Sequence, residues 1–77
     1  MPRRSSGVHD IRAEMVANVL SIQVVVGEQV GVGQQLLLLE SMKMEIPVLS
    51  DAAGHVVEIS VSPGDVIQEG DLLIRVS

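Results

Sequence analysis

The 77-residue sequence contains no cysteine and no phenylalanine, tyrosine or tryptophan. Without cysteine, no disulfide can stabilise a chain that is short enough to be only marginally stable as one small domain. Without aromatic residues, the core must be built from valine, leucine, isoleucine, methionine and alanine, and its many β-branched side chains favour a sheet over a helical bundle. The lack of cysteine is also compatible with a reducing cytoplasm.

Positive charge and long apolar runs are scarce as well. Residues 11–77 carry three basic and nine acidic side chains, which is a formal charge of −6. An acidic surface without aromatic platforms argues against contacts with phosphate backbones and stacked bases, so we expect no nucleic-acid binding. The longest apolar run, residues 36–39, is far too short to span a membrane. We therefore expect a protein of the cytoplasm that binds no membrane.

The chain divides into a short tail and one domain. Residues 1–10 mix proline, arginine, serine and glycine and, apart from Met1, have only Val8 as a sizeable apolar side chain. We expect a disordered tail over residues 1–10 and a single domain over residues 11–77. Within the domain, residues 20–24 and 57–62 alternate between apolar and polar side chains, which is typical of β-strands. No stretch of ten residues has a helical apolar stripe, so we predict an all-β fold.

An internal repeat with an offset of 37 residues connects the two halves of this domain. Gly27-Glu28 corresponds to Gly64-Asp65, and Gly33 corresponds to Gly70. The apolar positions Val19, Ile22, Val24, Val30 and Leu36 match Val56, Ile59, Val61, Ile67 and Leu73 in the same order. Two copies are too few for a solenoid. We expect them to pack face to face around a pseudo-twofold axis, as a flattened barrel or sandwich of two small sheets.

The repeat leaves one segment without a copy. Residues 13–40 have counterparts in residues 50–77, so residues 41–49 are interpreted as the joint between the halves, with a hairpin turn centred on Met42-Lys43. Two-residue hairpin turns require positive φ angles and prefer Asn-Gly or Asp-Gly, so Met-Lys is a poor turn sequence. Lys43 is also the only lysine of the chain. A surface lysine in a turn is the ordinary interpretation, but this combination indicates that side-chain chemistry overrides turn chemistry.

The segment around Lys43 resembles the attachment motif of biotinyl (biotin carboxyl carrier) domains, whose core is (Ala/Ser/Val)-Met-Lys-Met. The matching residues are Glu40-Ser41-Met42-Lys43-Met44-Glu45. The resemblance covers about residues 11–77 and includes the Gly-Glu-x-Val-x-x-Gly-x-x-Leu run at residues 27–36. In detail, the chain is similar to short, free-standing biotinylated carrier proteins of actinobacteria. This family implies two four-stranded antiparallel sheets with quasi-twofold symmetry, a barrel-sandwich hybrid.

The resemblance also implies a function. A biotin protein ligase would join biotin to the amine of Lys43, starting from biotinyl-adenylate. The chain would then be a non-catalytic carrier, monomeric when isolated, that moves CO2 from a biotin carboxylase to a carboxyltransferase of a biotin-dependent carboxylase, such as an acyl-CoA carboxylase. A covalently linked cofactor has a high effective concentration at each site that it visits. Met42 and Met44 would be flexible recognition contacts, and Glu40, Ser41 and Glu45 would form the surrounding hairpin.

Several alternatives accompany this hypothesis. Met42 and Met44 could merely cover apolar surface at the end of a sheet. Lipoyl domains share the fold, although they usually carry Asp-Lys-(Ala/Val/Ser) in the hairpin, and an unmodified relative could be an interaction or regulatory protein. The chain also departs from the family, because Glu14-Met15-Val16-Ala17 replaces Pro-Met-x-Gly and Asp51 replaces a common proline. Glu14 and Asp51 are repeat partners, so we expect altered turns only. His9 and His55, without cysteine, predict no metal site.

Overall fold

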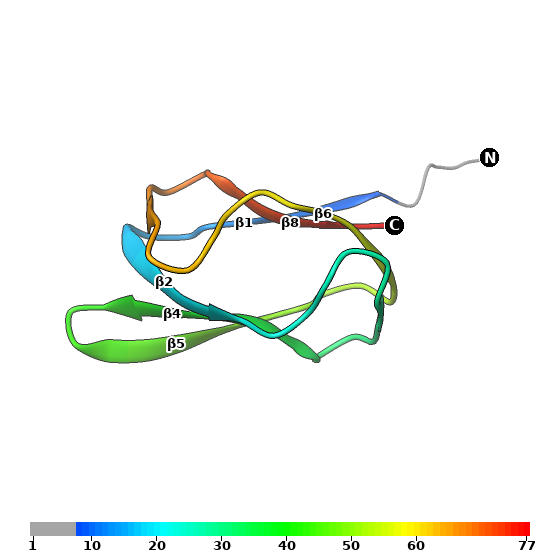
Figure 1. The fold of residues 1–77 in the computed structure, drawn as a ribbon, viewed down its shortest axis with the longest axis horizontal. Helices are drawn as coiled ribbons and strands as arrows, with labels where there is room; N and C mark the ends of the chain where they lie inside the picture. Colours follow the sequence, from blue (N-terminus) through cyan, green and yellow to red (C-terminus); the bar gives the residue numbers. More distant parts are fainter. Residues whose placement is uncertain (1–7) are drawn as a thin grey trace.

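The computed structural model describes residues 8–77, and these residues form two antiparallel four-stranded sheets that face each other (Figure 1). The strand orders are β1-β8-β6-β3 and β5-β4-β2-β7. The strands are β1 (His9–Arg12), β2 (Ala17–Ile22), β3 (Gln29–Val30), β4 (Gln35–Ser41), β5 (Met44–Leu49), β6 (Gly54–Ile59), β7 (Val66–Ile67) and β8 (Leu72–Val76). The predicted all-β fold with two sheets is confirmed. Nothing in residues 8–77 forms a helix long and apolar enough to cross a membrane.

The 37-residue repeat is a symmetry of the structure. It relates β1, β2, β3 and β4 to β5, β6, β7 and β8, and it converts one strand order into the other. The same backbone hydrogen bonds recur in both halves: Gly27 N donates to Val56 O at 2.7 Å, and Gly64 N donates to Val19 O at 2.8 Å. The two glycines have φ angles of 95° and 93°, which residues with a Cβ rarely adopt. The repeated glycines are therefore turn positions that close the two halves onto each other.

The first strand corrects two predictions. β1 begins at His9, so the domain starts two residues before residue 11. Of the rest of the predicted tail, Val8 is exposed and belongs to no strand, and residues 1–7 lie outside the described residues. β1 is also the repeat partner of residues 46–49, so the joint without a copy shrinks to residues 41–45. The reason is that β1 is an edge strand in which only Ile11 points into the core. Its other side chains are polar and gave no apolar alternation.

β-Bulges interrupt the alternation that was predicted over residues 20–24 and 57–62. The register shifts between Val19 and Ser21 in β2 and between Val56 and Glu58 in β6. Leu20 is consequently 38% exposed, whereas Val19 before it is buried. The bulges twist each sheet at the same relative place. Glu14 and Asp51 lie at equivalent bends that follow β1 and β5, as expected for repeat partners.

The core lies between the two sheets and consists of side chains from both repeats. Fourteen of the residues that the structure describes form it: Ile11, Ala13, Ala17, Val19, Val24, Val30, Leu36, Leu37, Leu39, Val56, Ile67, Leu73, Ile74 and Val76. The repeat partners Leu36 and Leu73 are both completely buried. At the far end, the carbonyl oxygen of Ser77 lies so close to Gly54 that a Cβ there would stand 2.5 Å from it. The chain thus requires glycine at this approach.

Candidate functional site: the β4–β5 hairpin

The β4–β5 hairpin places the whole predicted motif at one end of the domain. Ser41 pairs with Met44, and the two-residue loop between them consists of Met42 and Lys43, as predicted. Figure 1 shows this loop at the opposite end of the molecule from the C-terminus. The φ angles are 53° at Met42 and 64° at Lys43. Positive φ at both central residues is the pattern of a type I′ turn, and it costs about 1–2 kcal/mol for each non-glycine residue.

The side chains of the loop point into solvent. Met42 is 87% exposed and Met44 is 59% exposed, so neither covers the core, which argues against the purely structural alternative for these methionines. Lys43 is exposed too. No acidic side chain of residues 8–77 lies within ion-pair distance of its ammonium group, and it forms no hydrogen bond with them. The amine is therefore free to meet a partner.

The charges next to Lys43 are acidic. Glu40 and Glu45 lie directly opposite each other on β4 and β5, at the base of the loop. Like charges in such a cross-strand pair are destabilising, by about 0.2–1 kcal/mol. Among residues 8–77 the other basic side chains, Arg12 and Arg75, belong to strands of the other sheet. Within residues 8–77, Lys43 is thus the only positively charged side chain beside this carboxylate pair.

A shallow open groove of about 300 Å³ runs beside the loop. Its lining includes Val16 and Val66, which are 56% and 64% exposed, together with Asn18. The hydroxyl of Ser41 donates a hydrogen bond of 3.1 Å to the carbonyl oxygen of Val16, which fixes the hairpin to the β1–β2 connection. These three groove residues were not predicted from the sequence as site candidates. The repeat could have indicated Val66, because its partner in the other half is the polar Gln29.

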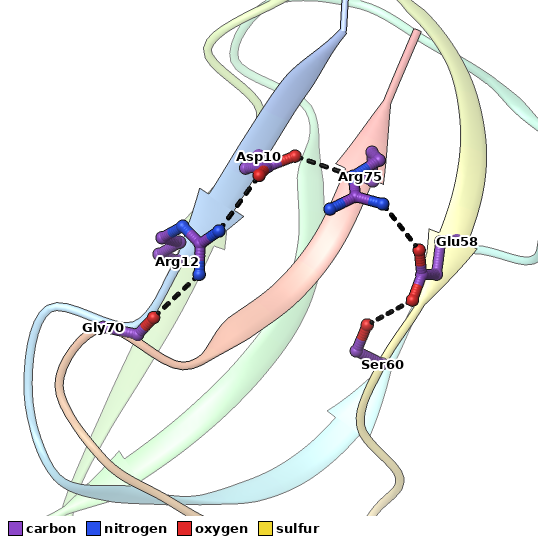
Figure 2. A network of polar contacts seen from close by, with 6 residues as sticks. All are labelled: Asp10, Arg12, Glu58, Ser60, Gly70 and Arg75. Carbon is purple, nitrogen blue, oxygen red and sulfur yellow. Dashed lines mark hydrogen bonds and ion pairs between the residues drawn. The ribbon is translucent and has the colours of Figure 1, made fainter.

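The strongest electrostatic feature lies on the other sheet (Figure 2). Arg75 donates hydrogen bonds to Asp10 at 2.8 Å and to Glu58 at 3.0 Å, and Arg12 donates to Asp10 at 3.1 Å. The hydrogen bond from Arg75 is the main reason that the pKa of Asp10 is lowered, and the same bond raises the pKa of Arg75. These ion pairs connect β1, β8 and β6. Residues 8–77 contain no group of three or more acidic or histidine side chains arranged to hold a metal.

A family model described as "Biotin-requiring enzyme" matches residues 9–76. The match covers most of the chain, so the chain belongs to the biotin/lipoyl attachment family, and biotin is the cofactor of this domain. The residues of the hairpin fit that group, because a covalent amide needs an exposed amine without a competing partner. The prediction of a biotin-requiring carrier domain is confirmed by this family membership.

Individual relatives and structures agree with the family. Over 68 residues the chain is 60% identical to the Biotinylated protein TB7.3 homolog of Mycobacterium leprae, covering 88% of this chain and 96% of that protein. It is 40% identical over 67 residues to the Biotin/lipoyl attachment protein of Bacillus subtilis, covering 87% and 92%. A single-chain, multi-domain long-chain acyl-CoA carboxylase contains a similar structure, with a TM-score of 0.84 and 29% identity over 97% of this chain and 8% of that one.

Proposed function

We propose that this protein is a biotin carboxyl carrier in which Lys43 is the attachment residue. The observation that carries the proposal is the position of Lys43: the only lysine of the chain is exposed and unpaired among residues 8–77, in a two-residue turn held at positive φ. When bound, biotin supplies the ureido nitrogen that carries CO2 between a biotin carboxylase and a carboxyltransferase. This chain holds the attached biotin at an exposed turn, from which it can extend to the sites of its partners.

The attachment step is an acyl transfer that a biotin protein ligase performs. The lone pair of the deprotonated Nζ of Lys43 attacks the carbonyl carbon of biotinyl-adenylate, a C–N bond forms, and the bond from that carbon to the phosphate oxygen breaks to release AMP. The lysine ammonium must first lose a proton, because only the free amine is nucleophilic. No carboxylate of residues 8–77 contacts this nitrogen. The ligase therefore supplies the base.

The hairpin performs the remaining work of the carrier. The β4–β5 ladder and the bond from Ser41 to Val16 hold the loop in one conformation, so the attached group swings from a defined point. Acylation removes the positive charge of Lys43 and leaves Glu40 and Glu45 as the local charges. Such a site favours partners with basic entrances, because complementary charge directs encounter and selects partners. The exposed Met42 and Met44 supply adaptable apolar contacts to each partner.

In vitro labelling tests the proposal. Purified protein is incubated with a biotin protein ligase, ATP and biotin, and the modified residue is mapped by peptide mass spectrometry. We expect one biotinyl group on Lys43, none in Lys43→Arg, and slower labelling of Met42→Thr/Met44→Thr. Met42→Leu/Met44→Leu is the matched control, because it keeps the apolar volume and should label at a rate nearer to that of the unaltered protein. Labelling of Lys43→Arg at another amine would contradict the proposed site.

A further inference from the structure

The outer faces of the two sheets differ at positions that the repeat makes equivalent. On the sheet β1-β8-β6-β3, the register places Asp10, Arg75 and Glu58 next to one another across three strands. Their ion pairs of 2.8 and 3.0 Å cover this face with charge (Figure 2). This row is what a solvated sheet surface normally carries.

On the other sheet the equivalent row is uncharged, and two of its three side chains are apolar. Pro47, Leu38 and Ser21 occupy the positions that Asp10, Arg75 and Glu58 hold in the first sheet, and the same register places them next to one another. Pro47 is exposed and Leu38 is half-buried.

Two further side chains extend this row. Leu49, which is 51% exposed, takes the place of Arg12, and Leu20, which is 38% exposed, lies in the neighbouring bulge. We refer to Leu20, Leu38, Pro47 and Leu49 as the apolar face.

The fold does not require apolar residues at Leu38, Pro47 and Leu49, because the equivalent positions of the other repeat belong to an ion-pair network. Leu20 is the exception, since its repeat partner Val57 is also apolar and exposed. A contiguous apolar surface without charges at its centre is typical of a protein interface. Pro47 lies on the edge strand β5 and has no N–H to offer, so the contact would be made by side chains and not by an added strand. A groove of about 470 Å³ between β1 and β5, which Pro47 and Leu49 also line, provides room for a partner's side chain. Its charged lining consists of one basic and three acidic side chains: Arg12, Asp10, Glu14 and Asp51.

The charges around the apolar face select the occupant. At the hairpin end it is bordered by Glu40 and Glu45, and the only basic group of residues 8–77 on that sheet, Lys43, becomes neutral when it is acylated. A second copy would bring another acidic border and a second net charge of −5 against this face. A surface with an apolar centre and a lysine- or arginine-rich border fits better. We propose that the apolar face docks a subunit of the biotin-dependent carboxylase with such a surface, an inference that rests on the proposed function.

The test transfers the charged row to the apolar face. Leu38→Arg/Pro47→Asp recreates the Arg–Asp pair of the other sheet, Leu49→Arg introduces the residue equivalent to Arg12, and Val57→Ser changes the opposite sheet as a matched control. Binding to the purified biotin carboxylase and carboxyltransferase subunits of the same host is measured by calorimetry. We expect the dissociation constant for at least one subunit to rise by roughly tenfold in both apolar-face variants and to stay unchanged in Val57→Ser. Unchanged binding in the apolar-face variants would overturn the inference.

Two further measurements separate the possible failures. Sedimentation equilibrium of the unaltered chain and of Leu49→Arg shows whether the face holds a second copy; a dimer that dissociates in the variant overturns the carboxylase assignment. Ligase labelling of each variant reports the hairpin alone and should proceed at the unaltered rate. If the unaltered chain accepts no biotin, the proposed function fails, while the calorimetric titration with unmodified chain still decides whether the face binds the subunits. Should the double variant not fold, Leu49→Arg carries the test.

Discussion

Replacing the loop residues by Met42→Asn together with Lys43→Gly is expected to stabilise the protein while removing its attachment site. Both residues have positive φ, which costs about 1–2 kcal/mol each for a side chain with an ordinary Cβ. Asn-Gly is the preferred sequence of a type I′ turn, so the double variant should be relieved of this cost. The greater flexibility of glycine in the unfolded chain offsets about 0.5–1 kcal/mol of the resulting gain in stability. The lost side chains are exposed, so no core contact disappears. The net expectation is about 1–2 kcal/mol of added stability.

Thermal and urea denaturation followed by circular dichroism measure this effect. For a domain of this size, the expected gain raises Tm by about 4–16 °C. Lys43→Ala is the control, because it removes the amine and keeps a Cβ at positive φ; it should change the free energy of unfolding by less than about 0.5 kcal/mol. If the double variant is no more stable than Lys43→Ala, the loop is not strained, and attachment chemistry does not override turn chemistry at these two residues.

Three further substitutions test the structure around this site. Asp10→Asn should reduce the loss of unfolding free energy that urea titrations measure between pH 6 and 2. The folded-state pKa of Asp10 is lowered, so its contribution to stability is present above the unfolded pKa of about 4 and is lost as pH falls through the lower folded value. An unchanged pH dependence in the variant would argue against the ion pairs. Gly54→Ala should destabilise the protein by about 1–3 kcal/mol in the same assay, because the new Cβ would meet the C-terminal carbonyl oxygen at 2.5 Å, whereas Gly31→Ala has open space and should change little; equal effects would contradict the close approach. Ser41→Ala should speed hydrogen exchange in the hairpin by removing a bond worth about 0.5–1.5 kcal/mol, and unchanged exchange would show that this bond does not hold the loop.

Much of the fold was predictable from the sequence because the repeat marks turns that physically require glycine. Gly27 and Gly64 are repeat partners, both have positive φ, and both donate equivalent hydrogen bonds across the sandwich. The hairpin was predictable for the opposite reason. Met42 and Lys43 are unfavourable at positive φ, and their presence between two apolar segments needed an explanation outside turn formation.

The parts that were missed depend on pairing in three dimensions. β1 is held by its ladder with β8 and by the ion pair between Asp10 and Arg75, which are 65 residues apart, so no local pattern marked it. The bulge at Leu20 depends on the partner strand in the same way. The apolar face likewise exists only because the register brings Leu38 next to Pro47, residues whose repeat partners are charged.

The intact mass of the protein purified from its native host tests the central claim most directly. We expect the mass of the chain plus one biotinyl group, with the group mapped to Lys43 and absent from Lys43→Arg. A lipoyl increment, or an unmodified chain in cells that contain an active biotin protein ligase, would contradict the assignment of this hairpin as a biotin carrier.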